Sequence, residues 1–232
     1  MAATEAILLA GGLGTRLRDA VPDLPKCMAP VNNQPFLYYV MQWLQQQGIS
    51  RFIFSLGYKH QVIIDWLEKQ YPQVDKVYAI EATPLGTGGA IQLASSKALT
   101  KAVLVVNGDT LFNIDIKSLY QFYQQQQAAC ALALKPMTNF SRYGTVTLNE
   151  NGLISAFKEK QYCDTGLING GVYLLNRQRF LSLGLPKQFS FEKDYLEAFT
   201  NKEKIAGLAM DSYFIDIGIP EDYNKAQQDL HP

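Results

Sequence analysis

A glycine-rich segment followed by basic residues has the composition of a phosphate-binding loop. Residues 11–18 read Gly-Gly-Leu-Gly-Thr-Arg-Leu-Arg, come directly after the apolar run 5–10, and precede Pro25-Lys26. The run predicts a buried strand, and the glycines allow a tight turn that points backbone N–H groups at an anion. Arg16 and Lys26 would add positive charge there. The alternative is a glycine-rich turn with solvated basic residues, but the ordered combination favours a phosphate site.

Two other phosphate-binding motifs do not fit this segment. A Walker loop requires Gly-Lys-Ser/Thr after a four-residue spacer, which the sequence lacks. A dinucleotide fingerprint requires Gly-x-Gly-x-x-Gly, and residues 12–17 end in Leu17 where the third glycine belongs. The sequence therefore argues against an enzyme that transfers hydride with a dinucleotide cofactor.

A carboxylate placed at a strand end could bind a metal ion. Asp109 follows the hydrophobic run 102–106 by way of Asn107-Gly108, which would put its side chain at the carboxyl edge of a sheet. Mg²⁺ prefers a few carboxylates together with phosphate oxygens and keeps much of its water, so it needs no dense ligand cluster. The alternative is a turn or capping role, which is common for aspartate after glycine.

The elements that would position these residues alternate between strands and helices in the first half of the chain. The predicted strands are 7–10, 51–56, 76–81 and 102–106, and the predicted helices are 36–47, 61–70 and 88–99. Strands joined by helices imply a parallel sheet with right-handed crossovers, whose ligands bind at the carboxyl ends of the strands. We therefore predict an α/β fold with a Rossmann-like, doubly wound, mixed but mainly parallel sheet.

The second half of the chain mixes the two kinds of element. Asn151-Gly152 lies between two alternating runs and predicts a hairpin. The predicted strands are 129–134, 144–148, 153–158, 170–175 and 205–209, and the predicted helices are 116–127, 190–200 and 220–230. We expect one domain over 1–232, with a first half to about 112 and an interwoven second half from about 113.

Composition limits the classes of partner. The chain has 232 residues, of which 47% are hydrophobic, and its 21 basic residues balance 21 acidic ones. A balanced charge provides no broad field for nucleic acid or an anionic membrane, so anions must bind at local clusters. The three cysteines are widely spaced and odd in number, which argues against a disulfide framework, and we interpret Cys27 as a small buried residue rather than a nucleophile. The apolar run near the amino terminus has no basic segment before it and is too short to cross a bilayer, so we expect a cytoplasmic protein.

The motifs together resemble those of the sugar-phosphate nucleotidyltransferases, which have a GT-A-like fold. The glycine-rich segment and its later Pro-Lys are the strongest part of this resemblance. Four further motifs extend it over nearly the whole chain: residues 84–90, 142–146, 167–171 and 213–218. Within the superfamily they are most similar to enzymes that act on D-glycero-α-D-manno-heptose 1-phosphate. The resemblance implies transfer of GMP from GTP, or another nucleoside monophosphate from its triphosphate, to a sugar 1-phosphate, with Mg²⁺ as cofactor and pyrophosphate as the second product.

The resemblance also implies a nucleotide site. Lys26 would stabilise the α-phosphate and Arg16 the leaving pyrophosphate, while the loop 84–89 would hold the base through backbone groups that its glycines bring close. Glu81 could accept hydrogen bonds from the guanine edge, and an ordinary surface carboxylate is an equal alternative. The expected nucleotide-binding residues are Leu9, Ala10, Gly11, Gly12, Gly14, Thr15, Arg16, Lys26, Glu81, Pro84, Gly86, Thr87 and Gly88.

A sugar-phosphate site and a second metal ligand follow from the same resemblance. Asp216 would bind the metal ion together with Asp109, Glu159 would bind sugar hydroxyls, and Lys160 would bind the sugar phosphate. Without the resemblance, residues 158–160 would be interpreted as a solvated strand end. Glu192 is as well suited to a helix cap or a surface charge. The expected sugar-phosphate residues are Gly144, Glu159, Lys160, Asn169, Gly170 and Glu192.

Other activities remain as alternatives at this stage. The nearest are transfer of GMP to mannose 1-phosphate, and of UMP or dTMP to another hexose 1-phosphate. A nucleotide-sugar-binding regulatory module is a remote one, because a sensor has no need for both metal carboxylates. The resemblance further implies that the product supplies a bacterial surface polysaccharide, whereas no sequence feature specifies an oligomeric state.

Overall fold

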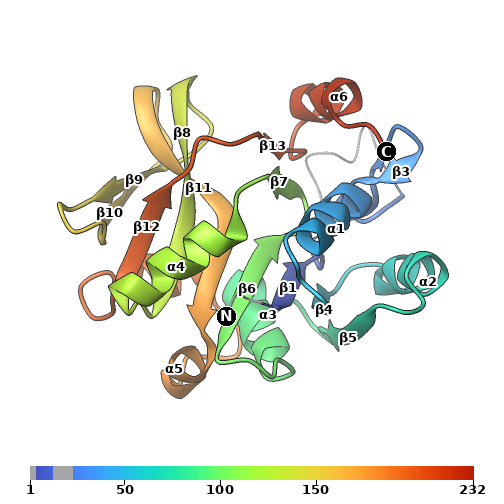
Figure 1. The fold of residues 1–232 in the computed structure, drawn as a ribbon, viewed down its shortest axis with the longest axis horizontal. Helices are drawn as coiled ribbons and strands as arrows, with labels where there is room; N and C mark the ends of the chain where they lie inside the picture. Colours follow the sequence, from blue (N-terminus) through green and yellow to red (C-terminus); the bar gives the residue numbers. More distant parts are fainter. Residues whose placement is uncertain (1–3, 13–22) are drawn as a thin grey trace.

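A nine-stranded mixed sheet forms the centre of the protein (Figure 1). The computed structural model describes residues 4–12 and 23–232, so the predicted site residues Gly14, Thr15 and Arg16 lie outside it. The strands run in the order β10-β9-β11-β6-β1-β4-β5, with β8 paired to β11 and β12 paired to β8. Their bounds are β1 Glu5–Leu9, β4 Arg51–Leu56, β5 Asp75–Ile80, β6 Ala102–Asn107, β8 Cys130–Phe140, β9 Thr145–Leu148, β10 Ile154–Lys158, β11 Cys163–Asn176 and β12 Ile205–Ala209.

The first half of the chain is parallel and wound on both faces, as predicted. Strands β6, β1, β4 and β5 are parallel neighbours. Ala6 and Leu8 of β1 belong to one buried cluster, whereas Ile7 between them belongs to the cluster on the opposite face. This alternation is the pattern of a strand covered by helices on both sides. The helices of this half are α1 Phe36–Gln46, α2 His60–Gln70 and α3 Gly86–Ser95.

The second half adds antiparallel strands to the edge of the parallel ones. Strand β11 pairs antiparallel with β6, β8 and β9. The predicted hairpin between β9 and β10 is present, and Gly152 has the positive φ of 75° that its turn requires. The helices of this half are α4 Ile116–Gln126, α5 Arg177–Ser182, a π-helical segment Phe191–Glu197 and α6 Pro220–Asp229.

The structure differs from the predicted elements in several respects. Helix α5 was not predicted, and the predicted helix 190–200 is the π-helical segment Phe191–Glu197. Strands β8 and β11 are much longer than predicted, because they pair with each other far beyond the apolar runs that indicated them. Several short elements were not predicted: β2 Pro30–Val31, β3 Gln34–Pro35, β7 Thr110–Phe112, β13 Phe214–Asp216 and a 3-10 turn Lys26–Met28. Elements of two or three residues show no periodicity that a sequence pattern could reveal.

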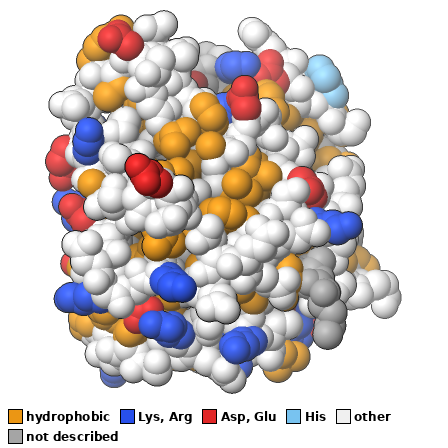
Figure 2. Space-filling view, turned by 60° about the vertical axis from the view of Figure 1, so that its left-hand side comes forward, with side chains coloured by type: hydrophobic (Ala, Val, Ile, Leu, Met, Phe, Trp, Pro, Cys, Tyr) orange, Lys and Arg blue, Asp and Glu red, His pale blue; other side chains and the backbone are white. Residues whose placement is uncertain are grey.

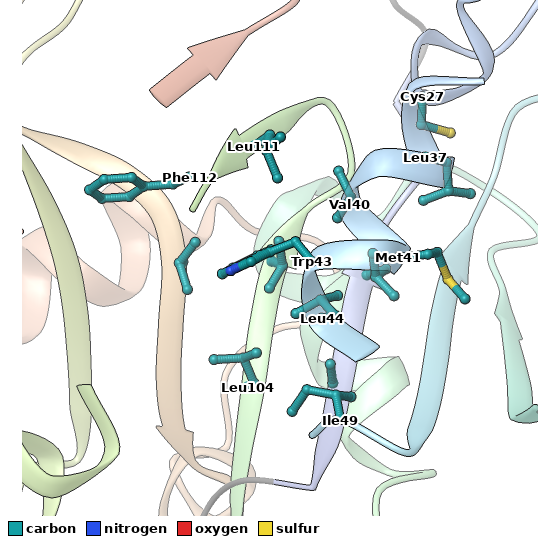
Figure 3. Close-up of a cluster of buried hydrophobic side chains, with 14 of the residues drawn as sticks. Cys27, Leu37, Val40, Met41, Trp43, Leu44, Ile49, Leu104, Leu111 and Phe112 are labelled. Carbon is teal, nitrogen blue, oxygen red and sulfur yellow. The ribbon is translucent and has the colours of Figure 1, made fainter. Parts of the chain in front are cut away.

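The buried side of α1 packs against β6 and against the segment from β7 to Ile114. Figure 3 shows Val40, Trp43 and Leu44 of this helix beside Leu104 of β6 and Leu111 of β7. The indole Nε1 of Trp43 donates a hydrogen bond to the carbonyl of Ile114 at 3.2 Å. These contacts hold β6 and β7, on either side of the connection that contains Asp109, against α1.

Cys27 lies in the same core, and its chemistry agrees with the structural interpretation. Its side chain is buried, and burial raises the pKa of the thiol to about 12, with the nearby Asp109 charge acting in the same direction. A thiol that is protonated at neutral pH is a poor nucleophile.

A buried carboxylate at the opposite end of the sheet has a structural role. Glu5, at the start of β1, accepts hydrogen bonds from the backbone of Leu99 and Thr100 and forms an ion pair with Arg51 at 3.0 Å. Burial acts to raise the pKa of Glu5, but these hydrogen bonds outweigh it and lower the pKa. The carboxylate therefore ties together the ends of neighbouring strands, away from the edge where ligands are expected.

The surface agrees with the balanced composition. On the face shown in Figure 2, acidic and basic side chains are interspersed, and hydrophobic side chains gather near its centre. Within residues 4–12 and 23–232, no helix has the length and apolar character to cross a membrane.

Candidate active site

Two adjoining cavities open beside the carboxyl ends of the parallel strands. The first has a volume of about 680 Å³ and the second about 490 Å³. Asn107 and Glu192 line both, so the cavities share a wall. This is the edge of the sheet where a doubly wound fold binds its ligands.

The first cavity contains most of the predicted nucleotide residues that the structure describes. Ala10 does not line it, because it is buried and its N–H donates to the carbonyl of Ser55 at 2.9 Å. The lining comes from the ends of four parallel strands and the segments that follow them, together with Glu192 of the π-helical segment: Leu9, Gly11, Gly12, Ser55, Gly57, Tyr58, His60, Glu81, Ala82, Thr83, Pro84, Gly86, Thr87, Ala90, Asn107, Asp109 and Glu192.

Glycines let two of these loops touch through their backbones. A Cβ atom at Gly57 would lie 2.9 Å from the carbonyl oxygen of Gly11, and one at Gly11 would lie 3.0 Å from both Gly57 N and Glu81 Oε1. No side chain fits at either position without displacing the neighbouring loop. The loop after β1 is therefore shaped by its contact with the loop after β4.

The glycines of the predicted base loop were expected to bring backbone groups close to the base. In the structure they instead allow close packing against residues 187–189. A Cβ atom would lie 2.5 Å from the carbonyl of Phe189 at Gly86, 2.2 Å from the Phe189 ring at Gly88, and 2.1 Å from the carbonyl of Lys187 at Gly89. Gly88 is buried under that ring and does not line the cavity. These glycines accommodate a segment from the second half of the chain, whereas only Gly86 of the three borders the cavity.

Two residues connect the base loop to its surroundings. Glu81 Oε2 accepts a hydrogen bond from the N–H of Leu85 at 2.8 Å, and burial raises the pKa of this carboxyl group. The hydroxyl of Thr87 donates to Glu192 Oε2 at 2.7 Å and accepts from the N–H of Phe191 at 2.9 Å. The loop is thus anchored at its start by Glu81 and tied at its end to the wall that both cavities share.

A short antiparallel ladder brings Asp109 and Asp216 together. Strand β13 pairs with β7 so that Asp216 lies opposite Thr110, and the N–H of Ile217 donates to the carbonyl of Asp109 at 3.1 Å. Lys26 Nζ lies between the two carboxylates, 2.6 Å from Asp109 Oδ2 and 3.2 Å from Asp216 Oδ1. Asp109 lines the first cavity and Asp216 the second. The three charged groups therefore stand at the junction.

The charges at this junction perturb one another. Burial acts to lower the pKa of Lys26, but the two carboxylates outweigh it and raise the pKa. Burial raises the pKa of Asp216 against the opposing effect of Lys26, and the charge of Asp109 adds to the rise. Each carboxylate is unfavourable beside the other unless a cation lies close to both.

A comparison with known proteins identifies the family. The family model described as nucleotidyl transferase matches residues 5–232. The chain belongs to this family. It is 49% identical to the D-glycero-α-D-manno-heptose 1-phosphate guanylyltransferase of Aneurinibacillus thermoaerophilus, over 97% of this chain and 98% of that protein. It is 43% identical to the enzyme of the same name from Campylobacter jejuni, over 94% of this chain and 96% of that protein.

A solved structure confirms the fold of this nucleotidyltransferase. HddC from Yersinia pseudotuberculosis, complexed with GMP-PN, is 36% identical and superposes with a TM-score of 0.87, covering 98% of this chain and 99% of that chain. The predicted α/β fold with a mixed, mainly parallel sheet is therefore confirmed, as is the predicted resemblance to the superfamily.

The second cavity of the nucleotidyltransferase contains four of the six predicted sugar-phosphate residues. Gly144 and Glu159 line neither cavity, and the backbone at Gly144 packs on the carbonyl of Lys158, which a Cβ would approach to 2.5 Å. The lining residues are Asn107, Thr110, Arg142, Tyr143, Lys160, Asn169, Gly170, Gly171, Glu192, Phe214, Asp216, Gly218 and Ile219.

Asn169 and its neighbours form a fixed part of this wall. The side-chain amide of Asn169 donates to the hydroxyl of Tyr173 at 2.9 Å, and its Oδ1 accepts from the N–H of Gly171 at 3.0 Å. Gly170 packs on Phe112, whose ring a Cβ would approach to 2.4 Å. Asn169 is therefore oriented by strand β11 itself.

Several residues of the two cavities were not among the predicted site residues. Arg142 donates to Asp222 Oδ2 of α6 at 2.5 Å and lies over the ring of Tyr143. Arg142 opens the motif 142–146 that carries part of the resemblance to the family, so this motif was the signal that could have identified it as a site residue. His60, whose Nδ1 is 3.1 Å from the carbonyl of Gly57, belongs to no motif. The other unpredicted lining residues include Ser55, Tyr58, Asn107, Thr110 and Phe214.

Nucleotidyltransferases generally use a divalent metal ion, and the junction has suitable donors. Asp109 and Asp216 already converge on one cationic group, Lys26 Nζ. Among the described residues, no group of three or more His, Cys, Asp or Glu side chains is arranged to hold a metal. A pair of carboxylates suits Mg²⁺ or Mn²⁺ completed by substrate phosphate oxygens and water rather than a closed protein site.

Proposed function

We propose that this nucleotidyltransferase transfers GMP from GTP to D-glycero-α-D-manno-heptose 1-phosphate, giving GDP-heptose and pyrophosphate. The identity to two enzymes of that name and the likeness to HddC, whose structure was solved with GMP-PN, support these substrates. We expect the reaction in the cytoplasm. The first half of the chain, to about residue 112, would bind GTP, and the second half the sugar phosphate, within one domain.

One observation supports the reaction most directly. Asp109 lines the larger cavity, Asp216 lines the smaller one, and Lys26 bridges them. A triphosphate in the first cavity and a sugar phosphate in the second would meet at this charged junction. Bond formation between two anions needs positioning and charge neutralisation more than a protein nucleophile.

On the nucleotide side, the described residues supply a cation and a base-binding group. Lys26 would stabilise the α-phosphate, and Arg16, outside the described residues, would stabilise the leaving pyrophosphate. Glu81 would accept hydrogen bonds from the guanine N1–H and 2-amino groups. Its Oε2 already holds the base loop through Leu85, so binding of the base and order in the loop would be linked.

On the sugar side, Lys160 lines the second cavity and would bind the acceptor phosphate. Glu192, Asn169 and Gly170 would contact the sugar. An oxygen of the sugar phosphate would then attack the α-phosphorus in line, the new P–O bond forming as the bond to pyrophosphate breaks. The phosphate oxygen is already ionised near neutral pH, so no general base is required.

Mg²⁺ would be held by Asp109 and Asp216, and it would supply charge neutralisation on the phosphates when bound. All other roles fall to side chains of this chain. The carboxylates orient the cation, Lys26 and Lys160 hold the two phosphates, and the cavity walls keep both substrates in register.

A panel of substrates tests the proposal. Pyrophosphate release is measured with GTP, ATP, CTP, UTP and dTTP, each combined with heptose, mannose and glucose 1-phosphates. The expected result is the highest kcat/KM for GTP with heptose 1-phosphate. Mannose 1-phosphate, whose sugar has one carbon and one hydroxyl group fewer, should react more slowly. Comparable efficiency with dTTP and glucose 1-phosphate would refute the proposed substrates and leave the family unchanged.

A further inference from the structure

Lys26 fills the space that a metal ion shared by the two carboxylates would need. Its Nζ lies within hydrogen-bonding distance of Asp109 Oδ2 and Asp216 Oδ1, at 2.6 and 3.2 Å. The lysine side chain is 15% exposed, against 36% and 28% for the aspartates. The lysine side chain as a whole is therefore the least exposed of the three, and a cation cannot bind both carboxylates through the same oxygens while the ammonium group remains there.

The carboxylates are held in place independently of the lysine. Asp216 Oδ1 accepts a second hydrogen bond from the N–H of Gly218 at 2.9 Å, and the hydroxyl of Thr110 donates to Asp109 Oδ1 at 3.3 Å. The backbones that carry them are paired through β7 and β13. Lys26 instead reaches the site on a flexible four-carbon stem. If one member of the cluster moves, it is the ammonium group.

Charge gives the reason for such a movement. Two carboxylates that converge on one point repel each other, and the ammonium group compensates that repulsion. A divalent ion alone would have to displace it, leaving two cations close together in a partly buried site. A triphosphate changes this balance because it offers the ammonium group a different anionic partner.

We propose that Lys26 is a positioning residue for the metal carboxylates: it keeps the pair charge-compensated until a nucleoside triphosphate draws its ammonium group to the α-phosphate and the metal ion takes its place. This inference rests on the metal site of the proposed function. It implies that the metal ion binds together with the nucleotide or after it, and binds weakly to the protein alone.

Binding of Mn²⁺ alone, followed by the paramagnetic resonance signal of the free ion, tests the proposal without turnover. Lys26→Met removes the charge, and Lys26→Gln removes the charge but keeps two N–H donors for the carboxylates. Without nucleotide, both variants should bind Mn²⁺ at least tenfold more tightly than the wild type. A non-hydrolysable GTP analogue should then increase Mn²⁺ affinity by a large factor in the wild type and by a smaller factor in either variant.

A matched control separates this effect from a general change in net charge. Lys135 pairs with Asp211 at 2.6 Å and with the carbonyl of Ser212 at 2.8 Å, and it lines neither cavity. Lys135→Met should leave Mn²⁺ binding as in the wild type. Circular dichroism identifies any variant that does not fold, and Lys26→Gln provides the test if Lys26→Met is unstable.

The outcomes distinguish this inference from the proposed function. If Asp109→Asn leaves Mn²⁺ binding to the nucleotide complex unchanged, the metal site of the proposed function is wrong. If Asp109→Asn weakens binding but folded Lys26 variants bind Mn²⁺ no more tightly than the wild type, the metal site stands and the role given to Lys26 here is overturned.

Discussion

The two cavities differ in how the chain builds them. Apart from Glu192, the first is formed by the ends of parallel strands and the segments that follow them, 9–12, 55–60, 81–90 and 107–109. The second takes residues from antiparallel β11, from the short β7–β13 ladder and from loops far apart in sequence. Loops after parallel strands converge because all the carboxyl ends lie at one edge. The second cavity depends on pairings between remote segments, which no local pattern specifies.

The difference predicts separable effects of substitution, except at the shared wall and the junction. Residues of the first cavity should change GTP parameters, and residues of the second should change sugar-phosphate parameters. Residues at the junction should change turnover itself. The following substitutions test this division, beginning with the largest expected effect.

Asp109→Asn should reduce kcat most. The amide keeps the shape of the side chain and loses the charge, which removes about 2–4 kcal/mol of transition-state stabilisation by analogy with other charge-stabilising groups. Steady-state kinetics across a range of Mg²⁺ concentrations measures the effect. Asp115→Asn is the matched control, because Asp115 caps α4 through the N–H groups of Lys117 and Ser118. It should leave turnover unchanged and alter thermal stability little, because asparagine caps a helix about as well as aspartate. Near-normal activity of Asp109→Asn at limiting Mg²⁺ would contradict the metal site proposed at the junction.

Lys160→Ala should raise KM for the sugar 1-phosphate far more than KM for GTP. Loss of a charge-assisted contact with phosphate corresponds to about 1.5–3 kcal/mol, or roughly tenfold to 150-fold. Lys158→Ala, on the same strand end and outside both cavities, should change neither constant. A larger rise in KM for GTP than for the sugar phosphate would show that Lys160 acts on the nucleotide and that its assignment to the sugar phosphate is wrong.

Glu81→Gln should weaken the binding of GTP and reduce the discrimination of the enzyme against ATP. Glutamine can still accept the hydrogen bond from Leu85 N–H, but its amide would face the guanine donors with a donor of its own, which costs about 1–3 kcal/mol. The ratio of kcat/KM for GTP to that for ATP is the relevant measurement. An unchanged ratio would mean that another group of the first cavity recognises the base.

Thr87→Val should have the smallest effect on the kinetic constants, and it should affect GTP and the sugar phosphate alike. It removes the hydroxyl that donates to Glu192 and accepts from Phe191 N–H, at a cost of about 1 kcal/mol. Because Glu192 lines both cavities, both KM values should rise severalfold together. A rise in KM for GTP alone would show that the shared wall does not link the two sites.

The sequence indicated the first cavity better than the second for reasons that individual residues illustrate. Gly11, Gly12 and Asp109 each follow a strongly apolar strand, so a short window contained both the element and its functional residue. The nearness of Asp216 to Asp109 depends on β7 and β13, which have three residues each and show no periodicity. Only the resemblance to the family brought Asp216 to attention.

Other residues show what local reasoning cannot decide. Gly86 and Gly88 both lie in the first turn of α3, yet Gly88 is buried beneath Phe189 and Gly86 borders the cavity. Glu159 and Lys160 are neighbours, yet only Lys160 lines the second cavity. In both pairs the tertiary structure, and no local pattern, determines which residue faces the cavity.

The fit of Phe189 against the base loop limits how the enzyme could be re-engineered. The loop reaches its position only because three glycines admit the Phe189 ring and the backbone of residues 187–189. A loop transplanted from an enzyme for another nucleotide would therefore clash with, or leave a gap beside, a segment more than ninety residues away. Productive chimaeras would have to exchange the base loop and residues 187–189 as one unit, although residues 187–189 line neither cavity.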